Sequence, residues 1–236
     1  MKTKLSSIVL LSLLAFTSCS NNSDKSKTES SDTTAVAADT AKPAEFIPFD
    51  FAEINHTVKD YAAWRPVFDA DSVVRKESGM ETIVVGRGQD NTNKVYIAFM
   101  VNDVQKAKDF VASPRLKDVR DKAGVISKPE VGFYRALRFN AESKEKNWVI
   151  INHKVKDFDA WLKVYDGEGV AKRAEEGMVD VLLARGIDDP NIVYIVFDIT
   201  DMEKAKAALS SESKKNLMMS AGVEGAPKMD FYTTAE

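Results

Sequence analysis

The sequence contains two closely similar stretches that decide its fold. Residues 54–64 read INHTVKDYAAW, and residues 151–161 read INHKVKDFDAW, 97 positions further along the 236-residue chain. Self-similarity at a fixed spacing indicates a repeated structural unit, and two copies indicate two related domains rather than a solenoid. After one inserted residue the likeness continues at an offset of 98, through Arg87-Gly88 with Arg185-Gly186, Val95-Tyr96-Ile97 with Val193-Tyr194-Ile195, and Phe133-Tyr134 with Phe231-Tyr232.

Each copy shows the same order of strand and helix signals. Asp60 and Asp157 are good N-caps for a first helix, which we expect to end at Gly79 or Gly177. A second helix follows Asp103 or Asp201, and a last strand follows Pro129 or Pro227. The other predicted strands cover residues 51–58, 81–87 and 94–101 in the first copy, and 148–155, 179–185 and 192–199 in the second. This βαββαβ order predicts an α+β fold of two tandem ferredoxin-like repeats.

The chain divides into five predicted segments. They are a signal peptide (1–19), a polar tether (20–45), the first repeat (46–137), a linker (138–146) and the second repeat (147–236). The tether contains no aromatic residue, so it cannot bury enough apolar surface to offset the entropy lost on ordering. We therefore expect it to act as a flexible spacer.

The N-terminal segment resembles the export signal of bacterial lipoproteins. It has a short basic start with Lys2 and Lys4, an apolar stretch from Ile8 to Phe16, and then Cys19. The resemblance implies that Cys19 is lipidated and that membrane lipid is a partner through this residue. It places the protein in the bacterial cell envelope, on the periplasmic side of a membrane or in the outer membrane. The alternative is an ordinary secretory signal in which Cys19 has no role.

Composition excludes several classes of function. Apolar residues make up 44% of the chain and charged residues 29%, with a formal net charge of −3, which is ordinary for a globular protein and does not suggest nucleic-acid binding. Cys19 is the only cysteine, and His56 and His153 are the only histidines. The folded part therefore has no thiol nucleophile and too few ligands for a zinc site, so we expect neither a metal nor a cofactor.

Three motifs together resemble the dimeric α/β-barrel superfamily. They are the opening Asn-His-x-Val-Lys-Asp-aromatic-x-x-Trp, the Asp-Pro-Asn turn at 189–191, and the closing Ala-Gly-Val…Pro…Phe-Tyr. Within that superfamily the chain is similar to antibiotic-biosynthesis-monooxygenase-like, or cyclase-like, proteins, over residues 50–136 and 147–234. The resemblance implies that two four-stranded sheets close a barrel. Here the two copies would close it within one chain, as a monomer; the alternative is a homodimer in which each half pairs across chains.

The alternation of side chains along the strands selects candidate site residues. The odd-numbered residues of 95–101 are all apolar, and we expect this face to pack on the helices. Tyr96 and Tyr194 lie on the opposite face, which lines the barrel interior, and Asn55 and Asn152 of the first strands are expected to meet tyrosines there. These four side chains are candidate contacts for a ligand in a barrel cavity.

His56 and His153 lie on the other face of the first strands. Each is a candidate ligand contact or proton shuttle, since histidine titrates near neutral pH. The alternative is a core histidine that packs under the first helix and hydrogen-bonds a backbone group. No cluster of carboxylates accompanies them, which argues against a metal site.

Two classes of function compete. The first is binding of a small apolar or aromatic molecule inside the barrel; the second is a cofactor-independent monooxygenase- or cyclase-like enzyme acting on such a molecule. A purely structural envelope protein is a third hypothesis. Catalysis needs a group with a matched pKa and a partner that orients it, and no local spacing shows such a pair, so we favour binding. Both ligand hypotheses require a barrel interior that side chains do not fill.

Overall fold

The computed structural model describes residues 46–235. The predicted signal peptide, the lipidation at Cys19 and the tether therefore lie outside the described residues. The first half contains β1 (Asp50–Thr57), α1 (Tyr61–Ala70), α2 (Ser72–Glu77), β2 (Met80–Gly88), β3 (Lys94–Val101), α3 (Val104–Ala112), α4 (Pro114–Lys122) and β4 (Glu130–Phe139). The second half contains β5 (Asn147–Val155), α5 (Phe158–Glu168), α6 (Val170–Glu175), β6 (Met178–Gly186), β7 (Ile192–Ile199), α7 (Met202–Ser210), α8 (Glu212–Ser220) and β8 (Val223–Thr234).

The predicted aspartate caps are confirmed. In each case the carboxylate accepts a hydrogen bond from the backbone N–H three residues later, at distances between 2.7 and 3.1 Å. Such a bond satisfies one of the backbone donors left free at a helix N-terminus. The four capping residues are Asp60, Asp103, Asp157 and Asp201.

Each helical segment that the sequence predicts as one helix is a pair of short helices. Ser113 separates α3 from α4 because it has an extended conformation, caps α4 through its side chain and precedes Pro114, which favours a helix start. Ser211 makes the same break in the second half without a proline. Gly177 ends the α5–α6 pair with a φ of +80°, and a Cβ there would lie 2.6 Å from a backbone oxygen.

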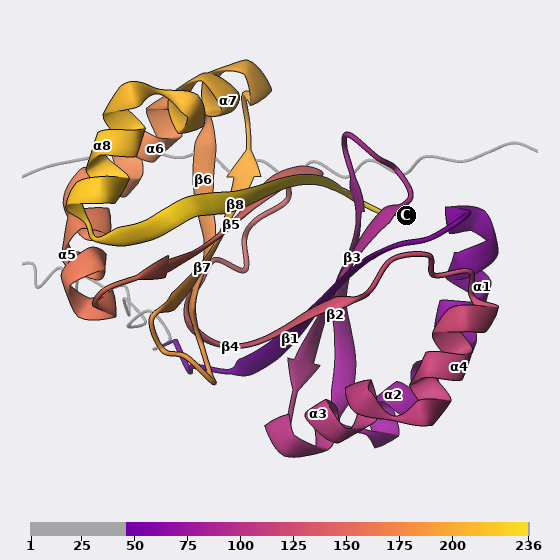
Figure 1. Cartoon of the computed structure of the whole chain (residues 1–236). Helices are drawn as coiled ribbons and strands as arrows, with labels where there is room; N and C mark the ends of the chain where they lie inside the picture. Colours follow the sequence, from indigo (N-terminus) through magenta and orange to yellow (C-terminus); the bar gives the residue numbers. More distant parts are fainter. Residues whose placement is uncertain (1–45, 236) are drawn as a thin grey trace, which may run out of the picture. The chain divides into compact units, whose positions relative to one another are not determined.

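The eight strands form a closed antiparallel ring. Its order is β1-β3-β2-β8-β5-β7-β6-β4, so each half contributes four neighbouring strands (Figure 1). The halves meet twice, where β2 pairs with β8 and where β4 pairs with β6. The predicted closure of the sheet within one chain is therefore confirmed. β4 continues to Phe139, two residues into the predicted linker.

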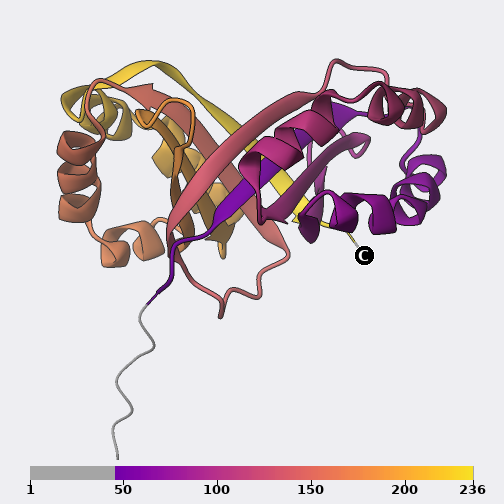
Figure 2. The ribbon, with the colours of Figure 1, turned by 90° about the horizontal axis from the view of Figure 1, so that it is seen from below.

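The helices lie outside this ring, α1–α4 against the first half and α5–α8 against the second, on opposite sides of the strands (Figure 2). Each group covers its own apolar core, and a third cluster of buried residues lies inside the ring. The odd-numbered residues of 95–101 belong to the helix-side core, as predicted, and Tyr96 belongs to the interior cluster. Within residues 46–235, none of the helices has the length and apolar character that crossing a bilayer requires.

Candidate ligand-binding pockets

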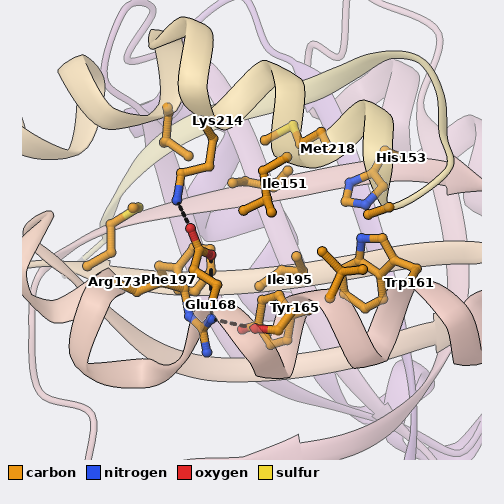
Figure 3. A pocket seen from close by; sticks show the side chains of 15 residues that line it. Ile151, His153, Trp161, Tyr165, Glu168, Arg173, Ile195, Phe197, Lys214 and Met218 are labelled. Atoms are coloured by element: carbon orange, nitrogen blue, oxygen red, sulfur yellow. Dashed lines mark hydrogen bonds and ion pairs between the residues drawn. The ribbon is translucent and has the colours of Figure 1, made fainter.

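Each half contains a pocket between its sheet and its helices. The first helix-side pocket is lined by His56, Trp64 and residues of α2, α3 and α4, and the second by His153, Trp161 and residues of α5, α6 and α8. Figure 3 shows the second pocket, with Ile151 and Ile195 of the sheet facing Met218 and the aromatic side chains of α5. Each has a volume of about 50 Å³ and mostly apolar walls.

The two histidines occupy equivalent places in these pockets. Both are 6% exposed, and each imidazole meets the neighbouring indole edge to face, with centroids 5.8 Å apart for His56–Trp64 and 5.6 Å for His153–Trp161. Neither ring nitrogen of either histidine has a hydrogen-bond partner among residues 46–235. The predicted packing under the first helix is confirmed, but the predicted bond to a backbone group is wrong.

Burial controls the charge of both imidazoles. Desolvation lowers the pKa of His153 to about 4, and desolvation together with the nearby Arg120 lowers the pKa of His56 to about 4. Both side chains are therefore neutral at pH 7, and each presents one N–H donor and one nitrogen acceptor. A buried polar group without a partner is costly, so a hydroxyl or carbonyl group in the pocket would find an unsatisfied partner there.

The second pocket also borders buried ionic groups. The guanidinium of Arg173 is 3% exposed and donates to both carboxylate oxygens of Asp180, at 2.8 and 2.7 Å. Lys214 bridges Glu168 and Glu176, the latter at 2.7 Å, and its contact with Glu168 is visible in Figure 3. These charged groups are paired with one another. In this pocket, His153 is therefore the polar side chain whose hydrogen-bonding atoms are available to a neutral ligand.

The first pocket has fewer ionic contacts. Arg75 lies over the ring of Phe68, at 3.7 Å from the centroid, and donates to the Phe68 carbonyl at 2.5 Å. Its Nε is buried without a partner among the described residues. Asp71 pairs with Arg115 rather than with Arg75. Burial lowers the pKa of Arg75, and the charges of Asp71 and Asp69 offset this only in part, whereas Arg173 hydrogen-bonds Asp180 directly.

The middle of the barrel is filled by aromatic side chains. Phe51, Tyr96, Tyr134, Trp148, Tyr194 and Tyr232 are each at most 5% exposed. The hydroxyls of Tyr96 and Tyr194 meet at 2.8 Å, and Phe51 and Trp148 stack on tyrosines of the last strands. The expectation that a ligand lies among the interior tyrosines is therefore not met at the centre of the barrel, because side chains occupy that space.

Asn55 and Asn152 lie at one end of this aromatic cluster. Both asparagines hydrogen-bond tyrosines, as expected, but the tyrosines belong to β4 and β8, the last strand of each half. Tyr232 donates to Asn55 at 2.8 Å, and Asn152 donates to Tyr134 at 2.8 Å. Both asparagines line a further pocket of about 200 Å³, which we call the barrel-mouth pocket. The six predicted site residues thus fall into three groups: the histidines in the helix-side pockets, the asparagines at the barrel mouth, and Tyr96 with Tyr194 in the packed centre.

Sequence reasoning missed Glu53. This residue lies on β1 two positions before Asn55, lines the barrel-mouth pocket and is 9% exposed. Strand alternation places it on the interior face with Asn55, so the signal was an acid on a face otherwise expected to be buried. Among residues 46–235 there is no group of three His, Cys, Asp or Glu side chains that could hold a metal ion.

These features define a class of α+β fold in which two ferredoxin-like halves close their strands into one ring. Several solved structures share this fold. A candidate monooxygenase from Lactobacillus acidophilus is 16% identical, with a TM-score of 0.51, over 79% of this chain and 93% of its own. A candidate monooxygenase from Fusobacterium nucleatum is 13% identical, with a TM-score of 0.52, over 80% and 93%. An anthrone oxidase-like protein is 12% identical, with a TM-score of 0.54, over 80% and 92%. No family model and no curated protein matches the sequence.

Proposed function

We propose that this protein binds a small, mainly apolar or aromatic molecule in its helix-side pockets, through a hydrogen bond to His56 or His153. The observation that supports this most directly is the neutral, buried imidazole with two unpaired nitrogens, present in both halves at the same place. Apolar walls with one convergent polar group are typical of small-molecule sites. The proposal moves the ligand from the centre of the barrel, which the aromatic side chains fill, to the other face of the same strands.

Binding requires the pockets to widen. A cavity that holds benzene in a protein core has a volume of roughly 150 Å³, which exceeds the 50 Å³ of each helix-side pocket. Met218 lies at the helix side of the second pocket, and its unbranched, flexible side chain can change rotamer at small cost. We expect the second pocket to admit a ligand by movement of this side chain.

The two histidines make the test specific. Because the chain contains only two, the side-chain ¹H–¹⁵N correlations of histidine report separately on the two pockets. Adding 1-naphthol should shift the imidazole signals, whereas naphthalene, which has no hydroxyl, should leave the nitrogen shifts nearly unchanged. His153→Phe should remove the response of the second pocket and His56→Phe that of the first, each serving as the control for the other. If 1-naphthol moves neither histidine up to its solubility limit, the binding proposal is wrong and a structural envelope role is favoured.

The enzyme alternative is a cofactor-independent oxygenase- or cyclase-like activity in the same pockets. The observation behind it is the free nitrogen of neutral His153, which can take up a proton from a bound phenol or anthrone, although the lowered pKa makes it a weaker base than an ordinary histidine. Oxygen consumption with anthrone, measured with an oxygen electrode, distinguishes the two. Consumption that disappears in His153→Phe, while the variant still binds 1-naphthol in its first pocket, would replace the binding proposal by the enzymatic one.

We also propose that the protein is a lipoprotein of the cell envelope, anchored through acylated Cys19. The export-type segment and the position of the only cysteine at its end support this. Labelled palmitate should be incorporated into the wild type and not into Cys19→Ala, and globomycin should leave the precursor uncleaved. A wild-type chain without label would contradict the anchor without affecting the pocket proposal.

A further inference from the structure

The barrel-mouth pocket is a second, chemically different cavity. It lies where β1 and β4 of the first half face β5 and β8 of the second. Its volume is about 200 Å³, compared with about 50 Å³ for each helix-side pocket. Besides the hydroxyl of Tyr134, its polar lining comes from Glu53, Asn55, Glu130, Asn152, Lys228 and Asp230. Three of these six are acids and only one is a base.

Glu53 is the unsatisfied group of this pocket. Tyr134 donates to its Oε1 at a long 3.4 Å, and its Oε2 is buried with no hydrogen-bond partner in the described part of the chain. Burial raises the pKa of Glu53 to about 7, although the hydroxyls of Tyr194 and Tyr134 and the charge of Lys228 oppose the shift. The carboxyl is therefore about half protonated at neutral pH.

The other charged groups facing Glu53 are already paired. Lys228 of β8 forms ion pairs with Glu130 of β4 and, at 3.7 Å, with Asp230 of β8. Asp230 also accepts from Lys94 at 2.5 Å. The remaining neighbours with titratable side chains are the tyrosines of β3, β4, β7 and β8, whose pKa values are raised by burial, so they stay neutral. Glu53 is thus the group whose ionised form lacks a counter-charge.

We propose that the barrel-mouth pocket binds a small organic cation, a primary ammonium of a few heavy atoms, whose charge is balanced by Glu53. An anion would meet three carboxyl groups and a lysine that is already engaged, so it is disfavoured. A cation would give Oε2 the charge-assisted hydrogen bond that it lacks. When it binds to the protonated carboxyl, the Glu53 O–H bond breaks, its proton goes to solvent, and the ammonium pairs with the carboxylate that remains.

The proton release gives the proposal its test. Ethylammonium chloride is titrated into the full chain by calorimetry at pH 5.5, 7 and 8.5, in buffers of different ionisation enthalpy, with ethanol and acetate as neutral and anionic probes. We expect ethylammonium to bind about 30-fold more weakly at pH 5.5 than at pH 8.5, since affinity falls about tenfold per pH unit below the pKa of Glu53. Close to one proton should be released at pH 5.5 and almost none at pH 8.5.

Two isosteric variants locate the effect. Glu53→Gln should weaken ethylammonium binding at pH 8.5 at least tenfold and abolish the proton release, whereas Glu224→Gln, which removes an equal charge from an exposed position of β8 outside the pocket, should weaken it less than threefold. The signals of His56 and His153 should not move, which separates this site from the helix-side pockets. Equal binding of ethanol, unchanged binding in Glu53→Gln, or no ethylammonium binding at 20 mM would each overturn the proposal.

Discussion

The two halves of the ring share their strand order, their aspartate caps and their unpaired histidines, but they differ in how their buried charged groups are paired. On the helix side of the second half, Lys214 and Arg173 meet three acids, whereas Arg75, buried on the helix side of the first half, donates to a backbone carbonyl. In the first half the buried acid without a counter-charge lies on the barrel side, as Glu53, where the second half has Ile150. At the first-half positions that correspond to Lys214, Glu168, Glu176 and Asp180 stand Leu116, Ala70, Ser78 and Thr82.

This difference shows that the backbone arrangement does not depend on the charges. Equivalent strands carry the same apolar alternation in both halves, and that pattern is what buries each sheet against its helices. The buried charged groups are therefore additions to a backbone arrangement that both halves share. The charged groups of each half can be buried stably only where their own partner residues are present. Exchanging residues between the halves therefore separates the two contributions.

The largest effect is expected when the second half is given the first-half residue at position 214. Lys214→Leu leaves Glu168 and Glu176, whose side chains are 12% and 16% exposed, without the lysine between them. Removing one member of a buried ionic group costs about 3–5 kcal/mol, and urea unfolding should show a loss of this size. Adding Glu168→Ala and Glu176→Ser, which completes the first-half set, should recover most of it. A triple variant as unstable as Lys214→Leu would contradict this account.

The pH dependence of stability should separate the histidines from Glu53. A histidine with a folded pKa of about 4 takes up its proton on unfolding, so each removes about 1.4 kcal/mol of stability per pH unit as pH falls from 6.5 to 4.5. Glu53 has the opposite sign, because its folded pKa is raised to about 7 and stability is lost as pH rises from 4.5 to 7.

Variants should therefore change the slope in opposite directions. Relative to wild type, Glu53→Gln should steepen the rise of stability between pH 4.5 and 6.5 by about 1.4 kcal/mol per unit, and His153→Phe should flatten it by the same amount. His56→Phe is the matched control and should behave like His153→Phe. Unfolding free energies measured at four or five pH values suffice, and a common slope for all variants would show that these groups are not buried as described.

A smaller effect is expected at Gly132, which pairs with Glu53 across the β1–β4 ladder. A Cβ at this position would lie 2.3 Å from the hydroxyl of Tyr134, so Gly132→Ala must displace the ring that donates to Glu53. Overpacking of this kind costs about 1–3 kcal/mol. The equivalent position in the second half is Asp230, and Asp230→Ala there introduces no such clash. A loss below about 0.5 kcal/mol for Gly132→Ala would mean that Tyr134 has room to move.

The smallest effect is expected when the first half is given an acid that only the second half contains. Thr82→Asp places a carboxylate where Asp180 pairs with Arg173, within the strand that faces Arg75 and its unpaired Nε. Thr82 is exposed, so the new ion pair should stabilise the protein by at most about 1 kcal/mol. Thr82→Asn controls for shape without charge. Equal stability of the two variants in thermal or urea unfolding would contradict a role for the missing charge.

Local patterns predicted most of the fold. The apolar alternation in 94–101 and 192–199 placed one face of each strand against the helices, and the four aspartates marked where helices begin. The breaks at Ser113 and Ser211 were not predicted. They depend on a serine that can either continue a helix or cap a new one.

The candidate site was predicted less completely. Strand alternation correctly set Asn55 and Asn152 on the barrel side and His56 and His153 on the helix side. It did not show that the barrel centre is full, because the space inside depends on how six aromatic side chains from different strands fit together. Glu53 was overlooked for a similar reason, since an acid is unusual only once its surroundings are known to be dry.

The sequence by itself determined the two βαββαβ halves, their caps and the face on which each strand residue lies, because these follow from residue spacings of two to four positions. Only the tertiary structure decided which groups remain without partners. Whether Glu53, His56 or His153 finds a hydrogen bond depends on residues from other strands and helices, many of them distant in the sequence. Desolvation, which sets their pKa values, is a property of that three-dimensional environment and has no local signature in the chain.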